Sequence, residues 1–389
     1  MTSNNQQRHD RADMALEKEK CFLVGAEIPG RYQADEEPLA ELAQLVDTAG
    51  GEVVGGLTQK LDKPTTRYYL GKGKFYDLVD MALEAGAETI VVDDDLSPAQ
   101  LSNLEEAARR KVIDRSEVIL DIFAHRAQSN QARLQVELAM LQYELPRLAR
   151  KWTHLERING GIGCGGGASR GTGEKQLELD RRIVRERIAR LRAQLDEIEE
   201  RKAREVAARD DFTACLVGYT NAGKSTVLNR LAGGEQARAE DRLLATIDPL
   251  TRKVALPDGE TALVSDTVGF IRRLPHHLVA SFHATLEEAA QADLLLVVVD
   301  AASPLARAQT RAVRATLASL GLESHDCLYV FNKIDAAPAD GIDLAHLRAE
   351  FAPAVEVSAA TGQGMDALVA ALQEKCAAGR RSVTVRFPA

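Results

Sequence analysis

The chain has few aromatic residues, few cysteines and no long apolar run. Phe, Trp and Tyr together make up 4% of its 389 residues. No apolar run approaches the roughly eighteen consecutive residues of a membrane-spanning helix, so we expect no membrane span. The five cysteines (Cys21, Cys164, Cys215, Cys327 and Cys376) are scattered and form no C-x-x-C pair. This predicts a reduced, cytoplasmic protein and argues against a disulfide framework or a zinc site.

The rest of the composition is that of an ordinary soluble α/β protein. Hydrophobic residues make up 45% of the chain, and its length suffices for two or three domains, each with its own core. The formal net charge of -9 argues against uniform binding of nucleic acid but leaves room for a local basic region. Residues 1–20 are polar and lack the apolar core of a signal peptide, so we expect a disordered lead-in.

Residues 21–115 alternate short apolar runs with helical patterns. The expected strands are 22–24, 52–54, 89–92 and 111–113, and the expected helices are 36–48, 74–85 and 98–109. Ser97 is expected to cap the last of these helices. This alternation predicts a small, largely parallel α/β domain. Within it, the basic segment 71–74 lacks the strand–loop–helix setting of a phosphate-binding loop, so we favour an ordinary basic loop over a nucleotide site.

Residues 116–210 are mostly helical in pattern. Leucines from Leu134 to Leu148 recur at three- and four-residue intervals and predict an amphipathic helix, and a similar apolar series predicts a second helix over 174–208. The segment between them, 160–173, is too rich in glycine to continue a helix. We therefore expect a long helical hairpin with a glycine loop at its tip.

This hairpin is basic although the whole chain is acidic. Residues 147–193 contain twelve Lys and Arg but five Asp and Glu. A solvated helix face is the ordinary interpretation of such a run. Its position around a glycine loop favours RNA contact, because free amides can approach phosphates and arginines can pair with them bidentately. Trp152 is expected to pack between the helices rather than to stack on a base.

The pattern G-x-x-x-x-G-K-S follows an apolar strand at 213–217 and precedes a helix, which is the setting that a triphosphate-binding loop requires. Its amides are expected to hold the phosphates, Lys224 to reach the β- and γ-phosphate oxygens, and Ser225 to bind Mg²⁺. The nucleotide-binding candidates of this segment are Gly218, Tyr219, Thr220, Asn221, Ala222, Gly223, Lys224, Ser225 and Thr226.

A second part of the site is the turn Asp266-Thr267-Val268-Gly269. Asp266 is expected at a strand end, where it holds Mg²⁺ through water, and the Gly269 amide is expected to meet the γ-phosphate. The next residue is Phe270, where many GTP-hydrolysing enzymes carry the glutamine that orients the attacking water. Phenylalanine has no hydrogen-bonding group, so we expect slow hydrolysis unless a partner helps.

Two further motifs predict the choice of base. Asn332, Lys333 and Asp335 form an N-K-x-D motif, whose last carboxylate can accept hydrogen bonds from N1 and N2 of guanine, which adenine cannot offer. Ser358 and Ala359 can supply a backbone amide to guanine O6. Each motif is weak alone, but their order and spacing predict a site for GTP and Mg²⁺.

The first switch is expected at 245–249. Thr246 is the candidate hydroxyl that completes Mg²⁺ coordination when GTP is bound, and Thr251 is the rival. The predicted catalytic residues are Lys224, Thr246 and Gly269. Nearby histidines lack the spacing of a metal site and are expected to be surface residues: His276, His277 and His283.

Longer motifs make the chain resemble the HflX family of ribosome-associated GTPases over nearly all of its length after residue 20. The motifs are L-S-P-A-Q-L at 96–101, V-I-D-R at 112–115, G-T-G-E-K-Q-L-E at 171–178, D-R-R at 180–182, D-T-V-G-F-I-R at 266–272, L-P-H at 274–276 and A-T-L-E-E at 284–288. The resemblance implies a cytosolic factor that binds the large ribosomal subunit and, in its GTP form, separates stalled or idle ribosomes. It also implies that the hairpin reaches ribosomal RNA near the peptidyl-transferase centre and that the ribosome stimulates hydrolysis.

The expected fold is α/β: a P-loop GTPase domain with a mostly parallel sheet, preceded by a small α/β domain and the hairpin. The expected parts are 1–20, 21–115, 116–210, 211–379 and a short strand or tail at 380–389. The glycine loop is longer than is common in the family. We expect a monomer in solution. Two alternative functions stay open, namely a GTPase that acts on immature ribosomal subunits and a GTP-gated switch for a protein partner.

Overall fold

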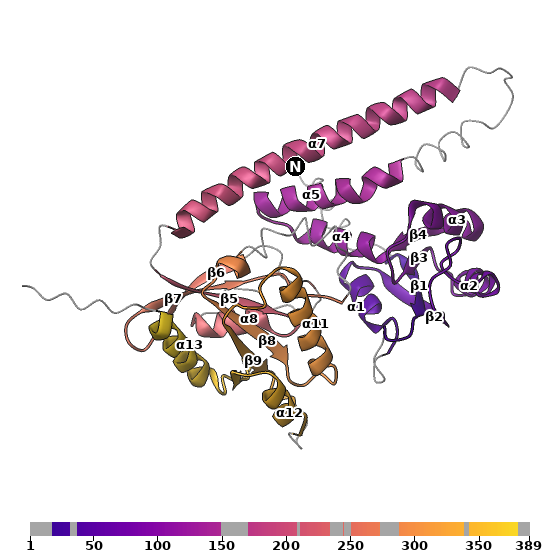
Figure 1. Cartoon of the computed structure of the whole chain (residues 1–389). Coiled ribbons are helices and arrows are strands. Elements are labelled where there is room, and N and C mark those ends of the chain that lie inside the picture. The colour runs from indigo at the N-terminus through magenta and orange to yellow at the C-terminus, as the bar shows by residue number, and fades with distance from the viewer. Residues whose placement is uncertain are drawn as a thin grey trace, which may run out of the picture. The chain divides into compact units, whose positions relative to one another are not determined.

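The structure, a computed structural model, describes residues 18–31, 37–148, 170–207, 211–233, 244, 250–272, 288–337 and 342–379 (Figure 1). The chain divides into two compact units, residues 1–119 and 120–389. No helix within the described ranges is long and apolar enough to cross a membrane.

The first unit contains a four-stranded sheet in the order β2-β1-β3-β4, in which every neighbouring pair is parallel. Its strands are β1 (Lys20–Glu27), β2 (Glu52–Lys60), β3 (Thr89–Val92) and β4 (Lys111–Asp114). Its helices are α1 (Ala40–Thr48), α2 (Lys72–Glu84), α3 (Pro98–Ala108) and α4 (Arg115–Arg126), which continues into the second unit. The central strands β1 and β3 are buried along nearly all their length, which explains their continuous apolar sequences.

The start of α3 can be traced to local sequence, whereas the start of α2 involves a residue twelve positions earlier in the chain. Ser97 caps α3 as expected, because its hydroxyl accepts a hydrogen bond from the Gln100 amide and the Gln100 side chain accepts one from the Ser97 amide. The expectation of a basic loop at 71–74 is wrong. Gly71 is the N-cap of α2, and its amide donates to Gln59 Oε1 at 2.9 Å.

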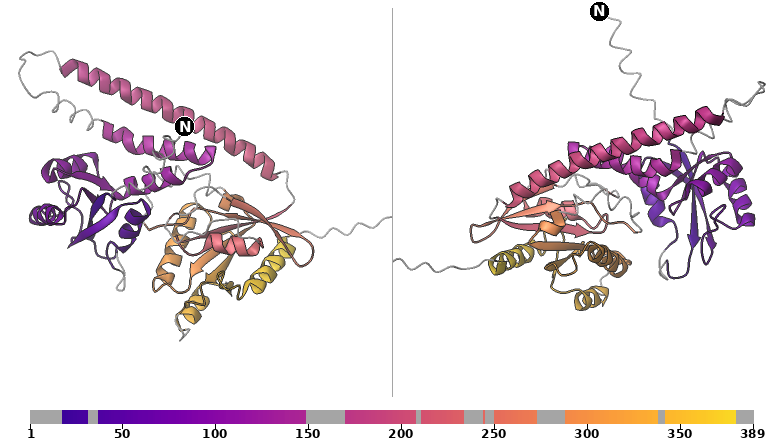
Figure 2. Two further views of the ribbon diagram at one scale, coloured as in Figure 1. Left: turned by 180° about the vertical axis from the view of Figure 1, so that it is seen from behind. Right: turned by 45° about the horizontal axis from the view of Figure 1, so that its top comes forward.

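The second unit includes the expected helical hairpin, whose two long helices lie side by side (Figure 2). The hairpin elements are α5 (Asn130–Glu144), the 3-10 helix η1 (Leu145–Arg147) and α7 (Arg170–Ala207). Leu138 from α5 packs with Leu191 and Leu195 from α7 in an apolar cluster. Arg187 donates to both carboxylate oxygens of Glu137, at 2.7 and 2.8 Å, and lowers the pKa of that carboxyl. Most of the glycine loop, with Trp152, lies outside the described residues.

The remainder of the second unit is built on a six-stranded sheet in the order β10-β9-β8-β5-β7-β6. The β6–β7 pair is antiparallel and the other pairs are parallel, which confirms the mostly parallel sheet. The strands are β5 (Phe212–Gly218), β6 (Leu250–Ala255), β7 (Thr261–Asp266), β8 (Leu294–Asp300), β9 (Cys327–Asn332) and β10 (Ala354–Glu356). The helices are α8 (Lys224–Leu231), α11 (Ala306–Ser319), α12 (Ile342–Glu350) and α13 (Met365–Gly379).

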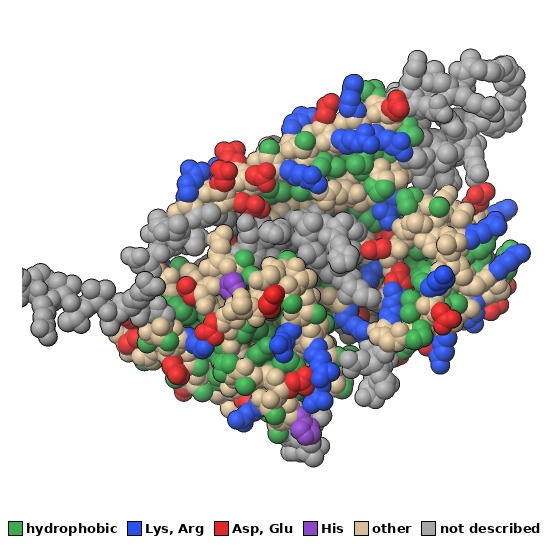
Figure 3. Space-filling model, viewed as in Figure 1, with side chains coloured by type: hydrophobic (Ala, Val, Ile, Leu, Met, Phe, Trp, Pro, Cys, Tyr) green, Lys and Arg blue, Asp and Glu red, His purple; other side chains and the backbone are tan. Residues whose placement is uncertain are grey.

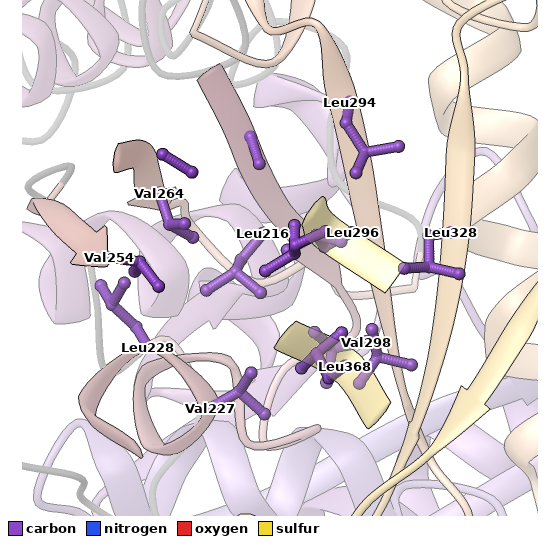
Figure 4. Close-up of a cluster of buried hydrophobic side chains, with 14 of the residues drawn as sticks. Leu216, Val227, Leu228, Val254, Val264, Leu294, Leu296, Val298, Leu328 and Leu368 are labelled. Atoms are coloured by element: carbon purple, nitrogen blue, oxygen red, sulfur yellow. The ribbon is translucent and has the colours of Figure 1, made fainter. Parts of the chain in front are cut away.

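Both faces of this sheet are covered by helices, which is why the central strands have unbroken apolar sequences. Leu216 and Leu296, on one face of β5 and β8, pack with Val227 of α8 and Leu368 of α13 (Figure 4). The alternate residues, such as Val217, belong to a second cluster that includes side chains of α11 and α12. The buried sheet thereby supplies a rigid support for the loops at the carboxyl ends of its strands.

Candidate functional site

The loop between β5 and α8 forms the centre of the site. β5 ends at Gly218 and α8 begins at Lys224. Gly223 has a φ of +90°, and a Cβ at this position would lie 2.3 Å from Asn332 Nδ2, so a side chain cannot be accommodated there. The loop leads directly to the N-terminus of α8, where unpaired amides and the helix dipole favour an anion such as phosphate.

Lys224 is 6% exposed, and its ammonium group folds back onto this loop. Nζ donates to the Tyr219 carbonyl at 3.0 Å and to the Gly218 carbonyl at 3.3 Å. Burial lowers the pKa of Lys224 to about 8, and the Asp266 carboxylate acts in the opposite direction. A bound phosphate would offer this buried cation a charged partner in place of neutral carbonyls.

Ser225 and Asp266 bring a hydroxyl and a carboxylate together. Ser225 Oγ donates to Asp266 Oδ2 at 2.6 Å. Asp266 is 1% exposed and ends β7, which lies beside β5 with Leu216 opposite Asp266. Both groups are hard oxygen donors, and Mg²⁺ in phosphate sites uses one or two such protein ligands together with water and phosphate. The residues present therefore fit Mg²⁺.

The turn after β7 lies against the phosphate-binding loop. A Cβ on Gly269 would lie 2.8 Å from Thr220 Cα and 2.9 Å from Lys224 Nζ, so glycine permits the close approach of this turn. Thr267 turns its hydroxyl away from the turn and donates to the Leu216 carbonyl at 2.7 Å. Thr267 and Gly269 can therefore meet a ligand only through their backbone.

Phe270 joins the same two loops through backbone hydrogen bonds. Its amide donates to the Gly218 carbonyl at 3.0 Å, and its carbonyl accepts from the Thr220 amide at 2.8 Å. Its ring is 5% exposed and belongs to the core cluster that contains Tyr219 and Ala289. The ring is thus a core side chain in this structure.

Asn332 links the loops of three motifs. Its Nδ2 donates to the Ala222 carbonyl at 2.9 Å, and its Oδ1 accepts from the Ala359 amide at 3.0 Å. The side chain is 2% exposed. One buried carboxamide therefore holds the phosphate-binding loop and the S-A loop together.

The other N-K-x-D residues face different surroundings. Lys333 has a φ of 63° and places Nζ 2.7 Å from Asp300 Oδ2 at the end of β8. Asp335 is exposed, and its carboxylate makes no hydrogen bond or ion pair with another residue of the described chain. Ser358 is buried, and its hydroxyl accepts from the Thr361 amide at 3.1 Å, which shapes the loop.

The sheet therefore brings the predicted motifs at 218–226, 266–269, 332–335 and 358–359 to the carboxyl ends of its parallel strands. Thr246 lies outside the described residues, as do His276, His277 and His283. The rival Thr251 lies in β6, with Oγ1 2.8 Å from Ser265 Oγ on β7.

Sequence reasoning did not single out two residues of this site. Asp300 could have been found from the sequence, because it is a carboxylate at the end of the apolar run of β8. No sequence pattern distinguishes Arg230, since an arginine in the last turn of a helix is common.

The fold and the order of these loops define the class of protein. Binding of phosphate, Mg²⁺ and guanine is assigned to four loops in the chain order of a GTPase, and a parallel sheet presents them on one side. This part of the chain is a P-loop GTPase domain.

Comparison with known proteins gives the family. Three family models match in succession: "GTP-binding GTPase N-terminal" at 36–124, "GTP-binding GTPase Middle Region" at 126–209 and "50S ribosome-binding GTPase" at 213–333. GTPase HflX of Lacrimispora saccharolytica is 45% identical over 359 residues, which cover 92% of this chain and 82% of that protein. GTPase HflX of Escherichia coli (strain K12) is 42% identical over 369 residues, or 91% of this chain and 82% of that protein.

The chain belongs to the HflX family of ribosome-associated GTPases, and it is a GTPase that uses GTP and Mg²⁺. A solved structure, a GTP-binding protein from Sulfolobus solfataricus in complex with GDP, matches 92% of this chain and 99% of its own, at 22% identity and a TM-score of 0.47.

Proposed function

We propose that this GTPase acts in the cytoplasm as a monomer that binds the large ribosomal subunit and, with GTP bound, separates stalled or idle ribosomes into subunits. Membership of the HflX family supports a ribosomal partner. The observation that carries the proposal is the arginine-rich surface of α7, which precedes the GTPase domain in the chain.

The exposed surface of α7 suits the RNA backbone. Arg182 and Arg185 are exposed, whereas Arg187 is held by Glu137 of α5. Arg182 lies 3.7 Å from Glu186, an exposed pair that contributes little and is easily exchanged for a phosphate. Figure 3 shows Lys and Arg side chains along α7, with Asp and Glu among them. Guanidinium groups in such positions can pair bidentately with phosphates, and we assign the hairpin segment 147–193 this role toward ribosomal RNA.

The GTPase site supplies binding and orientation. We assign the phosphates to the amides of 218–226 and to Lys224, the γ-phosphate to the Gly269 amide, and guanine to Asp335 and the 358–359 loop. Ser225 and Thr246 would ligate Mg²⁺, and Asp266 would hold it through water. When bound, Mg²⁺ neutralises charge that develops on the phosphate oxygens. Lys224 would exchange its two carbonyl acceptors for phosphate oxygens and so orient the β- and γ-phosphates.

The water that attacks the γ-phosphate must be placed by another group. Phe270 has no donor or acceptor in its side chain, and its ring lies in the core. We infer that the ribosome orders the switch segments or contributes the missing group, so that hydrolysis is coupled to ribosome binding.

Sedimentation tests the proposal. With a non-hydrolysable GTP analogue, the chain should co-sediment with the large subunit in a sucrose gradient, and 70S particles should shift to subunits. The triple variant R181Q/R182Q/R185Q should lose most of this binding, whereas the control R201Q/R204Q, which removes two exposed arginines from the other end of α7, should retain it. Absence of GTP-dependent co-sedimentation would refute the proposal.

The alternatives give different patterns in the same experiment. A GTPase for subunit assembly would bind precursor particles in preference to mature subunits and leave 70S particles intact. A switch for a protein partner would bind ribosomes equally well with and without the three arginines.

A further inference from the structure

Arg230 connects the last turn of the phosphate-binding helix to the S-A loop. It lies in α8, the helix that begins with Lys224 and Ser225. Its Nε donates to the Ala359 carbonyl at 3.1 Å, and its Nη2 donates to the Ala360 carbonyl at 2.6 Å. A Cβ on Gly362 would lie 3.6 Å from Arg230 Cζ, so the guanidinium also lies next to Gly362 in this loop.

In this loop the direction of each amide follows from the carbonyl of the same peptide bond, because the C=O and the N–H of a trans peptide point in opposite directions. In the first plane, the Ser358 carbonyl accepts from the Gly362 amide at 2.8 Å and the Ala359 amide donates to Asn332 Oδ1 at 3.0 Å. In the third, the Ala360 carbonyl accepts from Arg230 and the Thr361 amide donates to Ser358 Oγ at 3.1 Å. Both planes are held from two sides.

The middle plane, between Ala359 and Ala360, is held from one side. Its carbonyl accepts from Arg230, while the amide of the exposed Ala360 makes no hydrogen bond with any described residue. The Arg230 contact therefore sets the direction of this amide and points it away from α8. The preceding Ala359 amide, which the sequence motif suggested for guanine O6, is already used by Asn332.

We propose that Arg230 is a positioning residue for guanine recognition: it orients the Ala359–Ala360 peptide so that the Ala360 amide donates to the O6 carbonyl of the base. This inference rests on the guanine site assigned above. It divides base recognition between two elements, with Asp335 accepting from N1 and N2 and the Arg230-held amide donating to O6. It also ties the guanine loop to the helix whose other end binds phosphate.

Equilibrium binding of three nucleotides to the full chain tests the proposal, by competition against fluorescent GDP. GDP carries O6 and both donors. IDP keeps O6 and lacks the 2-amino group. 6-Thio-GDP keeps both donors but has a sulfur, a weak acceptor, in place of O6. Arg230→Ala should lower the affinity for GDP and IDP about tenfold and the affinity for 6-thio-GDP less than about threefold. The reason is that the variant misplaces the amide that contacts O6.

Two further variants separate positioning from general damage. Arg230→Lys can still donate to a loop carbonyl and should restore part of the GDP affinity. Arg311→Ala removes an exposed arginine that pairs with Glu350 on α12, and it should leave all three affinities unchanged. Equal weakening of all three nucleotides by Arg230→Ala, or no weakening of GDP, would overturn the inference. If the unaltered chain did not prefer GDP to ADP, the guanine site itself would be refuted, and this inference with it.

Discussion

Phe270 forms a parallel β-bridge with Tyr219, and both side chains lie in the same buried cluster. The bridge joins the turn after β7 to the phosphate-binding loop through the backbone. The Tyr219 hydroxyl adds a second link between the two segments, because it accepts a hydrogen bond from the Arg272 amide at 3.0 Å. The residue in the position of the catalytic glutamine is thus part of the core that holds this turn against the phosphate-binding loop.

Phe270→Gln should destabilise the chain and should not create a fast enzyme. It places a carboxamide in an apolar cluster, which we expect to lower the free energy of unfolding by about 2–4 kcal/mol. Thermal unfolding with parallel GTP turnover provides the measurement. Phe270→Leu, which keeps the cluster apolar, is the control and should be milder. A stable Gln variant with greatly raised unassisted turnover would show that the side chain alone limits hydrolysis.

Lys224→Ala should weaken nucleotide binding strongly while leaving the fold intact. Lys224 is a buried cation whose pKa is lowered to about 8 by burial, so its charge opposes folding in the absence of phosphate. We expect GDP and GTP affinity to fall on the order of 100-fold or more, with little change in thermal unfolding. Titration calorimetry together with a melting curve checks both parts. Unaltered GTP binding by this variant would refute the assignment of the phosphate site.

Asn332→Ala should lower both stability and nucleotide affinity. The change leaves the Ala222 carbonyl and the Ala359 amide without their shared partner in a buried position. We expect the free energy of unfolding to fall by about 2–4 kcal/mol and GDP to bind more weakly. Denaturant unfolding and GDP titration provide the two values. A variant with normal stability would mean that Asn332 does not hold the two loops together.

Asp335→Asn should change the preferred base. In the proposed site the carboxylate would accept from N1 and N2 of guanine, whereas a carboxamide presents one donor and one acceptor, which suits the carbonyl at position 2 of xanthine. We expect GDP affinity to fall and XDP affinity to rise. Because Asp335 is exposed, thermal unfolding should be unaffected. Retained preference for GDP over XDP would argue against the assigned role of this carboxylate.

The sequence was sufficient for those parts of the fold that depend on local patterns. The apolar runs of β3, β5 and β8 could be read directly because buried parallel strands are apolar on both faces. The S-x-x-Q pattern of a capping box, which begins at Ser97, predicted the start of α3. Segment 71–74 was expected to be a loop, but α2 begins at Lys72, and the Gly71 amide is held by Gln59 from twelve residues earlier in the chain.

The motifs of the site could be predicted from the sequence, but the contacts between their loops could not. Gly223 and Gly269 were expected from the motifs, yet the reasons that they must be glycine are contacts with Asn332 and Thr220 from other loops. The burial of Phe270 and the two hydrogen bonds of Arg230 also depend on tertiary packing. No pattern within a single segment contains such information.

Dependence of hydrolysis on the ribosome is tested most directly by GTP turnover with and without purified large subunits. Alone, the chain should hydrolyse GTP slowly. Large subunits should raise turnover on the order of 100-fold or more, as partner-supplied groups do in other GTPases. Small subunits should have little effect, and R181Q/R182Q/R185Q should lower the stimulation. Fast turnover by the chain alone, or no stimulation by large subunits, would contradict a ribosome-dependent GTPase.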